Sequence, residues 1–185
     1  MDRRIKYTKK VIKDTLISLL KEKDINKITV SEICKQSDIN RATFYRYYLD
    51  AYNLLDSIQE ELVTELKEAC YKTEDSDSFT SFAKELLIVF TNNKELVKIL
   101  FNTKYNRDFF SDIFEIAYDK FKDRWEEACI VNEEYIEYAS IYIFNGALGV
   151  INYWVKCDFD KDVSEIAKLI ETISSNCLRS LKFKI

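Results

Sequence analysis

The feature that most constrains the fold is the stretch from Thr29 to Tyr48, TVSEICKQSDINRATFYRYY, whose pattern indicates two short helices joined by a tight turn. Thr29 stands three residues before Glu32, a spacing typical of a capping box at the start of a helix. The segment 37–40 interrupts the helical pattern with side chains that favour turns, and its last residue, Asn40, is a favoured N-cap for the next helix. A helix, a short turn and a second helix form the arrangement that places the second helix in the major groove of DNA.

The second helix of this stretch has one apolar face and one face rich in hydrogen-bonding groups. Phe44 and Tyr48 are four residues apart and share a face, which we assign to the core. Arg41 is the candidate for a base contact, because a guanidinium pairs bidentately with guanine. The remaining candidates around it, which we expect to touch base edges or to add electrostatic attraction, are Ser31, Ala42, Arg46 and Lys27.

The segment ITVSEICKQSDINRATFYRYY, followed by Asp50 and by Leu54 and Leu55, resembles the DNA-binding domain of the TetR family of bacterial transcriptional regulators. Residues 43–45 are the most diagnostic part, and the resemblance covers residues 8–56. The segment from Gly146 to Trp154 is similar to one branch of the family's C-terminal domain. The resemblance implies a homodimeric, ligand-responsive regulator that binds a double-stranded DNA operator, most often as a repressor. It also implies phosphate contacts from four hydroxyl groups, those of Thr29, Thr43, Tyr45 and Tyr47.

The chain departs from the family pattern at three positions. Asp38 stands where the turn usually has glycine, and aspartate can adopt the same backbone conformation. Ala42 replaces a common glycine or proline. Ala51 stands where a lysine usually reaches the phosphate backbone. The loss of that lysine keeps open an alternative function, a TetR-like coactivator that works through a protein partner or a small metabolite.

The absence of proline and the presence of only two glycines, Gly146 and Gly149, predict an all-α chain, because strands and hairpins normally need turn-forming residues. We expect a three-helix helix-turn-helix domain over residues 1–50. A helical bundle for ligand binding and dimerisation is expected over residues 51–185. The sequence predicts helices over residues 8–23, 51–71, 79–91, 94–101, 108–129, 133–156 and 163–181, with a basic arm over residues 1–7 and a polar linker over residues 72–78.

Charge is distributed unevenly along the chain. Residues 1–48 contain 12 basic and 6 acidic residues, a net charge of +6, and residues 49–185 contain 16 and 26, a net charge of −10. The two sum to the whole-chain value of −4. This asymmetry indicates a basic module for a polyanion attached to an acidic body.

Several classes of protein and site are disfavoured by the residues that are missing. The chain has no histidine, and its five cysteines form no C-x-x-C pair, so we expect no metal site, cofactor or disulfide framework. Two glycines cannot build a P-loop or a dinucleotide fingerprint, and a catalytic triad lacks its histidine, so we expect no enzyme. No signal peptide or membrane-spanning run is expected, which favours a cytoplasmic protein.

The helices over residues 133–156 and 163–181 are expected to form the dimer interface through apolar seams. The first seam contains Ile136, Ala139, Ile143, Ala147, Val150 and Trp154. The second contains Ile166, Leu169, Ile170, Ile173, Cys177 and Leu181. An intramolecular core would show the same pattern, so both interpretations stay open.

The body is also rich in aromatic residues, which can line gaps between helices and bind a small apolar effector. The candidates are Phe110, Phe114, Tyr118, Trp125, Tyr138 and Tyr142. Ordinary core packing explains each of them equally well.

Overall fold

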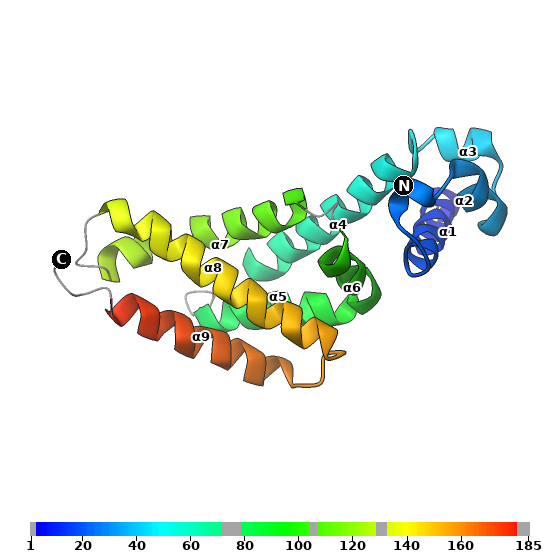
Figure 1. The fold of residues 1–185 in the computed structure, drawn as a ribbon. Coiled ribbons are helices and arrows are strands. Elements are labelled where there is room, and N and C mark those ends of the chain that lie inside the picture. The colour runs from blue at the N-terminus through cyan, green and yellow to red at the C-terminus, as the bar shows by residue number, and fades with distance from the viewer. Residues whose placement is uncertain (1–2, 72–78, 104–106, 129–132, 181–185) are drawn as a thin grey trace. The chain divides into compact units, whose positions relative to one another are not determined.

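The computed structural model describes residues 3–71, 79–103, 107–128 and 133–180 (Figure 1). These ranges contain helices and no strand, and the predicted all-α class is confirmed. The helices, in chain order, are α1 (Arg3–Leu20), the 3-10 turn η1 (Ile25–Lys27), α2 (Val30–Gln36), α3 (Arg41–Tyr45), α4 (Ala51–Tyr71), α5 (Phe79–Asn92), α6 (Lys94–Asn102), α7 (Arg107–Ala128), α8 (Glu133–Lys156) and α9 (Val163–Ser180).

The helix bounds follow the sequence pattern closely, with one clear exception at the N-terminus. Helices α4 and α8 begin and end at the predicted residues. Helix α1, by contrast, begins at Arg3 rather than at Thr8, so the described part of the expected basic arm is helical. Arginine, lysine and isoleucine are compatible with a helix, and no glycine or proline interrupts it. The predicted linker over residues 72–78 lies outside the described residues.

The chain divides into two compact units, and the division falls within α4, between Leu62 and Val63. The first unit contains α1, η1, α2, α3 and the first half of α4, together with Asn102 and Thr103 at the end of α6. Its core consists of apolar side chains that are nearly or fully inaccessible to solvent, among them Ile12, Leu16, Leu19, Ile25, Ile33, Phe44, Leu54 and Leu55. Burial of this apolar surface is the main source of stability for these short helices, since helices of five to seven residues are marginal alone.

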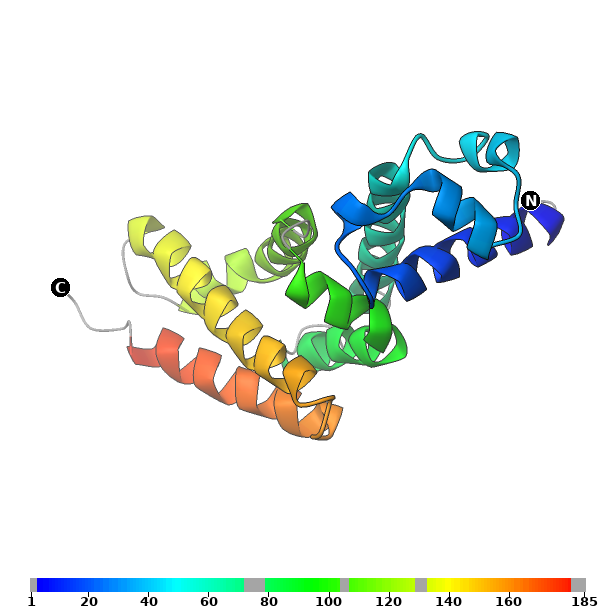
Figure 2. The ribbon, with the colours of Figure 1, turned by 45° about the vertical axis from the view of Figure 1, so that its right-hand side comes forward.

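The second unit is a bundle in which α9 packs against α5, α8 and α7, and α7 packs against α8. Helices α8 and α9 run antiparallel and are joined by a tight turn (Figure 2). In this turn Asp158 and Phe159 adopt positive φ values of 58° and 59°. The turn is held by a hydrogen bond of 3.0 Å from Trp154 Nε1 to the Lys161 carbonyl and by an ion pair of 2.6 Å between Lys98 Nζ of α6 and Asp158.

Candidate nucleic-acid interface and apolar pocket

Both helices of the helix-turn-helix begin after a residue whose side chain caps the helix N-terminus. Thr29 Oγ1 accepts a hydrogen bond of 3.3 Å from the Glu32 amide, and Asn40 Oδ1 accepts one of 2.8 Å from the Thr43 amide. Both predicted N-caps are therefore confirmed. The Glu32 carboxylate accepts a hydrogen bond from Lys23 Nζ. Each cap satisfies an amide that the helix itself leaves without a partner.

The turn between α2 and α3 depends on a left-handed residue. Asp38 has a φ of 52°, a conformation that aspartate tolerates better than most side chains. Around it, Ser37 Oγ donates to the Ile33 carbonyl at 2.7 Å, and the Ile39 amide donates to the Cys34 carbonyl at 3.0 Å. These bonds use the last carbonyls of α2 and fix the direction in which α3 leaves the turn.

The apolar face of α3 is anchored by the two residues that the i,i+4 spacing assigned to the core. Phe44 is fully buried and Tyr48 is 4% exposed, with ring centroids 5.8 Å apart. Burial raises the pKa of Tyr48 to about 12, and the nearby Glu61 carboxylate adds to the rise. The Ser57 hydroxyl acts in the opposite direction, yet the Tyr48 hydroxyl has no hydrogen-bond partner of good geometry among the described residues. The second helix is thereby locked by packing, and its other face turns outward.

None of the predicted DNA-contacting side chains lies in the core. Tyr45 is 55% exposed, Tyr47 and Thr43 are half-buried, and the others are exposed: Thr29, Ser31, Arg41, Ala42 and Arg46. Arg41 donates a hydrogen bond of 2.5 Å from its guanidinium to Ser31 Oγ, which joins the start of α3 to the first turn of α2. Arg41 and Ser31, two residues proposed to read base edges, therefore lie together.

The start of α4 offers no cationic contact. Asp50 Oδ1 caps the helix by accepting a hydrogen bond of 2.8 Å from the Asn53 amide. Ala51 is 4% exposed, so its side chain belongs to the core of the first unit. Its neighbours Leu49, Asp50 and Tyr52 are exposed, and none of them carries a positive charge.

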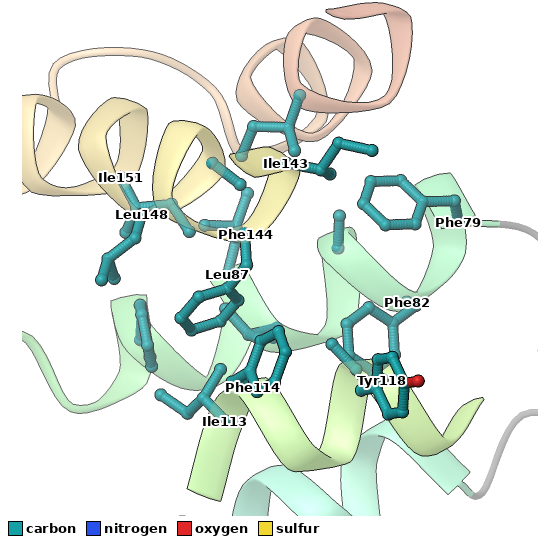
Figure 3. A pocket seen from close by; sticks show the side chains of 16 residues that line it. Phe79, Phe82, Leu87, Ile113, Phe114, Tyr118, Ile143, Phe144, Leu148 and Ile151 are labelled. Atoms are coloured by element: carbon teal, nitrogen blue, oxygen red, sulfur yellow. The ribbon is translucent and has the colours of Figure 1, made fainter. Parts of the chain in front are cut away.

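The second unit contains an apolar pocket between α5, α7, α8 and α9 (Figure 3). The space between its walls amounts to about 670 Å³, including the part open to solvent. Tyr118 has the only polar side-chain group among the lining residues, and its hydroxyl points away from the other labelled side chains. The remaining lining residues are Phe79, Phe82, Ala83, Leu86, Leu87, Phe90, Ile113, Phe114, Ala117, Ile143, Phe144, Ala147, Leu148, Ile151 and Ile170.

Two of the six predicted ligand residues, Phe114 and Tyr118, line this pocket, and their rings stack at 5.7 Å. Phe110 instead packs against Phe101, and their ring centroids are 4.9 Å apart. Tyr138 and Tyr142 are each 70% exposed and are not among the residues that line this pocket. The side chain of Trp125 lies outside the described residues. Aromatic content identified the body as rich in rings, but it carried no information about which helix face turns inward.

The α5 wall of the pocket does not follow from the sequence. An apolar stripe on a helix indicates burial, but not a gap beside the buried residues. Phe82 of this wall meets Phe121 of α7 edge-on, with ring centroids 5.2 Å apart. No motif or spacing in the sequence distinguishes this contact from ordinary core.

Lys120 of α7 connects the pocket wall to the end of α4. Its Nζ donates a hydrogen bond of 2.6 Å to the carbonyl of Cys70, in the last turn of α4. The same ammonium lies 5.2 Å from the ring centroid of Tyr71 and 5.8 Å from that of Phe82, which lines the pocket. Cations are favoured at helix C-termini, where the last carbonyls have no partner within the helix. Burial raises the pKa of the Cys70 thiol to about 12, and the Lys120 charge only partly offsets this effect.

The structure places much of the predicted dimer seam inside the protomer, which corrects that part of the prediction. Five of its residues are buried: Ala139, Ile143, Trp154, Ile166 and Ile170. Ile136 and Leu181 lie outside the residues whose side chains are described. The apolar side chains that α8 and α9 leave exposed are different ones in most cases: Tyr138, Ile141, Tyr142, Tyr153, Leu169 and Ile173. An apolar stripe predicts that its residues are buried. Here the packing of α5 and α7 against α8 and α9 already buries them within one protomer, so no partner is needed to cover them.

Neither a metal-binding cluster nor a membrane-spanning helix is found in the described part of the chain. It contains no group of three or more Asp, Glu, Cys or His side chains placed to hold a metal ion. Within the same ranges, no helix has both the length and the apolar character needed to cross a bilayer.

Comparison with known proteins identifies the second unit by sequence and the whole chain by fold. A family model of TetR regulators, described as "Transcriptional regulator C-terminal region", matches residues 77–176. Curated protein sequences give no significant match.

Solved structures with this fold cover nearly the whole chain. A TetR transcriptional regulator from Streptococcus agalactiae is 23% identical with a TM-score of 0.69, over 94% of this chain and 96% of its own. A putative TetR-family regulator from Syntrophomonas wolfei is 16% identical with a TM-score of 0.73, covering 94% and 95%. The dihydroxyacetone kinase operon activator DhaS is 18% identical with a TM-score of 0.66, covering 94% and 97%.

Proposed function

Since the chain belongs to the TetR family of transcriptional regulators, we propose that it is a homodimeric repressor that binds a DNA operator and responds to a small apolar effector. The observation that carries this proposal is the helix-turn-helix of the first unit. Its second helix is anchored by Phe44 and Tyr48, and it exposes a set of cationic and hydroxyl side chains on the opposite side.

Each exposed side chain has a proposed role in binding DNA. Arg41 reads a base, most favourably guanine, and its hydrogen bond to Ser31 orients the guanidinium before DNA arrives. Ala42 is small enough to let the helix approach base edges. The hydroxyls of Thr29, Thr43, Tyr45 and Tyr47 bind phosphates, and Arg46 adds electrostatic attraction.

Dimerisation is proposed to occur through the exposed apolar face of α8 and α9. Tyr138 and Tyr142 are one helical turn apart on α8, as are Leu169 and Ile173 on α9. Gly146 and Gly149 also leave open space, with no atom within 4 Å of a Cβ placed on either. A second copy could therefore approach α8 closely and form a four-helix interface. Two copies would present two recognition helices to half-sites about one helical turn apart.

The effector is proposed to bind in the apolar pocket. Its walls offer no charge and a single hydroxyl, so a charged group buried there would lose its hydration without compensation. An effector changes DNA affinity only if it favours one conformation of the dimer over another. Lys120 provides a physical connection, because it contacts both pocket-lining Phe82 and the last turn of α4.

Salt-dependent fluorescence anisotropy on duplexes tiled across the DNA upstream of the protein's own gene tests the DNA-binding role. We expect tight binding centred on a palindrome, with affinity falling steeply as salt rises. Binding that is weak and indifferent to sequence on every duplex would contradict direct operator recognition. That result would instead favour the coactivator function, which a pull-down from the native cytosol would then examine.

The sign of regulation needs a separate measurement, because DhaS is by name an operon activator. A reporter gene placed behind the bound duplex should become more active when the regulator is removed. A fall in reporter activity on removal would overturn repression and leave DNA binding intact.

A further inference from the structure

We propose that the first two turns of α1 form a second phosphate-binding surface, which contacts the DNA backbone flanking the site read by α3. We call this surface the α1 basic face and define it by Arg3, Lys6, Lys9 and Lys10. The inference rests on the proposed DNA-binding function and extends it to a part of the chain outside the helix-turn-helix.

The charge of this segment is of one sign. From Arg3 to Lys13 the chain contains six basic residues and no acidic one. Because the helix begins at Arg3, side chains three and four positions apart project from neighbouring points of its surface. Arg3, Lys6 and Lys10 follow this spacing and are all exposed.

The segment has no evident role in the core of the first unit. The buried residues of α1 are Ile12, Leu16 and Leu19, all of which lie beyond its first two turns. Like charges close together on a helix destabilise it slightly, so the clustering is unfavourable for folding itself. When a polyanionic partner binds, the same cluster of positive charges becomes favourable, because each charge is then attracted to the partner.

Lys9 joins the α1 basic face to the proposed recognition surface. Its Nζ lies 5.4 Å from the ring centroid of Tyr47, the residue that follows α3 by two positions. Figure 2 shows the N-terminal end of α1 and the short helix α3 at the same end of the unit. Lys13, one turn further along α1, is already neutralised by an ion pair with Glu61 of α4. On α1, the exposed cations Arg3, Lys6 and Lys10 therefore lie toward the end whose Lys9 contacts Tyr47.

DNA is the partner that this placement favours. B-DNA carries one negative charge for about every 1.7 Å of its axis, so phosphates extend past the groove that a recognition helix occupies. A cationic row beside Tyr47 is continuous with the proposed phosphate contacts of Tyr47 and Thr43. The start of α4 brings no cation to the interface, since Ala51 is buried and Leu49 is apolar.

The test compares two triple variants with equal changes in net charge. Arg3→Gln, Lys6→Gln and Lys10→Gln remove three charges of the α1 basic face. Lys84→Gln, Lys156→Gln and Lys168→Gln remove three exposed charges from α5, α8 and α9. Glutamine has nearly the same helix propensity as lysine and arginine, so both variants should fold, which circular dichroism would verify. The readout is the slope of log affinity against log salt concentration, on one duplex containing the operator and one of random sequence.

Each lost phosphate contact should make the slope shallower by about 0.9. We expect the α1 variant to lose between about one and three units of slope per protomer on both duplexes, and the control variant to keep the wild-type slope. An α1 variant with the wild-type slope would overturn this inference alone. Wild-type protein whose binding is weak and sequence-blind on all duplexes would instead overturn the proposed function.

A double-mutant cycle tests the connection through Lys9. Lys9→Gln and Tyr47→Leu should each weaken binding, and the double variant should lose less than the sum of the two losses. Strictly additive losses would show that Lys9 does not act together with Tyr47.

Discussion

At the scale of single residues, Arg41 is the side chain on which sequence specificity should depend most. Arg41→Ala is expected to cost about 1–3 kcal/mol of binding free energy and to relax the preference at one base pair. Tyr47→Phe removes a proposed phosphate contact and should weaken binding to all sequences alike. Anisotropy titrations of single-base operator variants measure both effects. Equal losses on operator and random duplexes for Arg41→Ala would remove it from the base-reading role.

Ser31→Ala tests the hydrogen bond that Arg41 makes in the free protein. The hydroxyl of Ser31 accepts from the Arg41 guanidinium at 2.5 Å, so its loss leaves the guanidinium less ordered without removing its charge. We expect a smaller loss of affinity than for Arg41→Ala, with the salt dependence unchanged.

Tyr48 should make the stability of the first unit sensitive to alkaline pH. Its pKa rises from 10.0 to about 12 in the folded state, so folding favours the neutral phenol. The resulting stabilisation is complete below pH 10 and is lost as pH rises from about 10 to 12. At pH 11 the loss should be about 1.4 kcal/mol, relative to a variant without the hydroxyl.

Tyr48→Phe is that variant, and urea unfolding at pH 8 and pH 11 provides the comparison. At pH 8 the variant should be about as stable as the wild type, because the buried hydroxyl lacks a well-placed hydrogen-bond partner. At pH 11 it should be the more stable of the two. Identical losses of stability in both proteins would show that Tyr48 ionises as freely as in the unfolded chain.

At the scale of elements, the last turn of α4 depends on a residue from another helix. Lys120→Met keeps an apolar stem but removes the bond to the Cys70 carbonyl, which then loses its cationic partner. We expect a loss of about 1.5–3 kcal/mol in the free energy of unfolding, the range for hydrogen bonds that involve a charged group. Chemical denaturation measures it, with the exposed Lys84→Met as control. An equal effect of both substitutions would argue against a specific role for Lys120.

The elements also show where sequence reasoning was sufficient. The N-caps Thr29 and Asn40, the core pair Phe44 and Tyr48, and the full extent of α4 all follow from local spacing. Local rules suffice here because a cap or an i,i+4 pair is complete within one turn of helix. The start of α1 was predicted too late, since an exposed, cationic helical turn lacks the apolar periodicity that identifies helices in a sequence.

At the scale of the whole molecule, self-association should depend on the exposed apolar face of α8 and α9. Light scattering coupled to size-exclusion chromatography should give twice the chain mass of 22.0 kDa for the wild type. Tyr142→Glu combined with Ile173→Glu should shift the mass to that of a monomer, because carboxylates cannot be buried there without a partner. Lys168→Glu, also exposed on α9, should remain dimeric. A monomeric wild type, or a dimeric double variant, would contradict the proposed interface.

The sequence by itself determined the helical class, the helix-turn-helix and the outward side of α3, because these depend on residues close together in the chain. Only the tertiary structure decided which apolar stripes meet inside the protomer. Ile143 and Ile170 face the pocket, whereas Tyr142 and Ile173, close to them in sequence, remain exposed. The same periodicity fits a core, a pocket wall and a dimer seam. The choice among them depends on which other helices already cover the stripe, and that information is distributed over the whole chain.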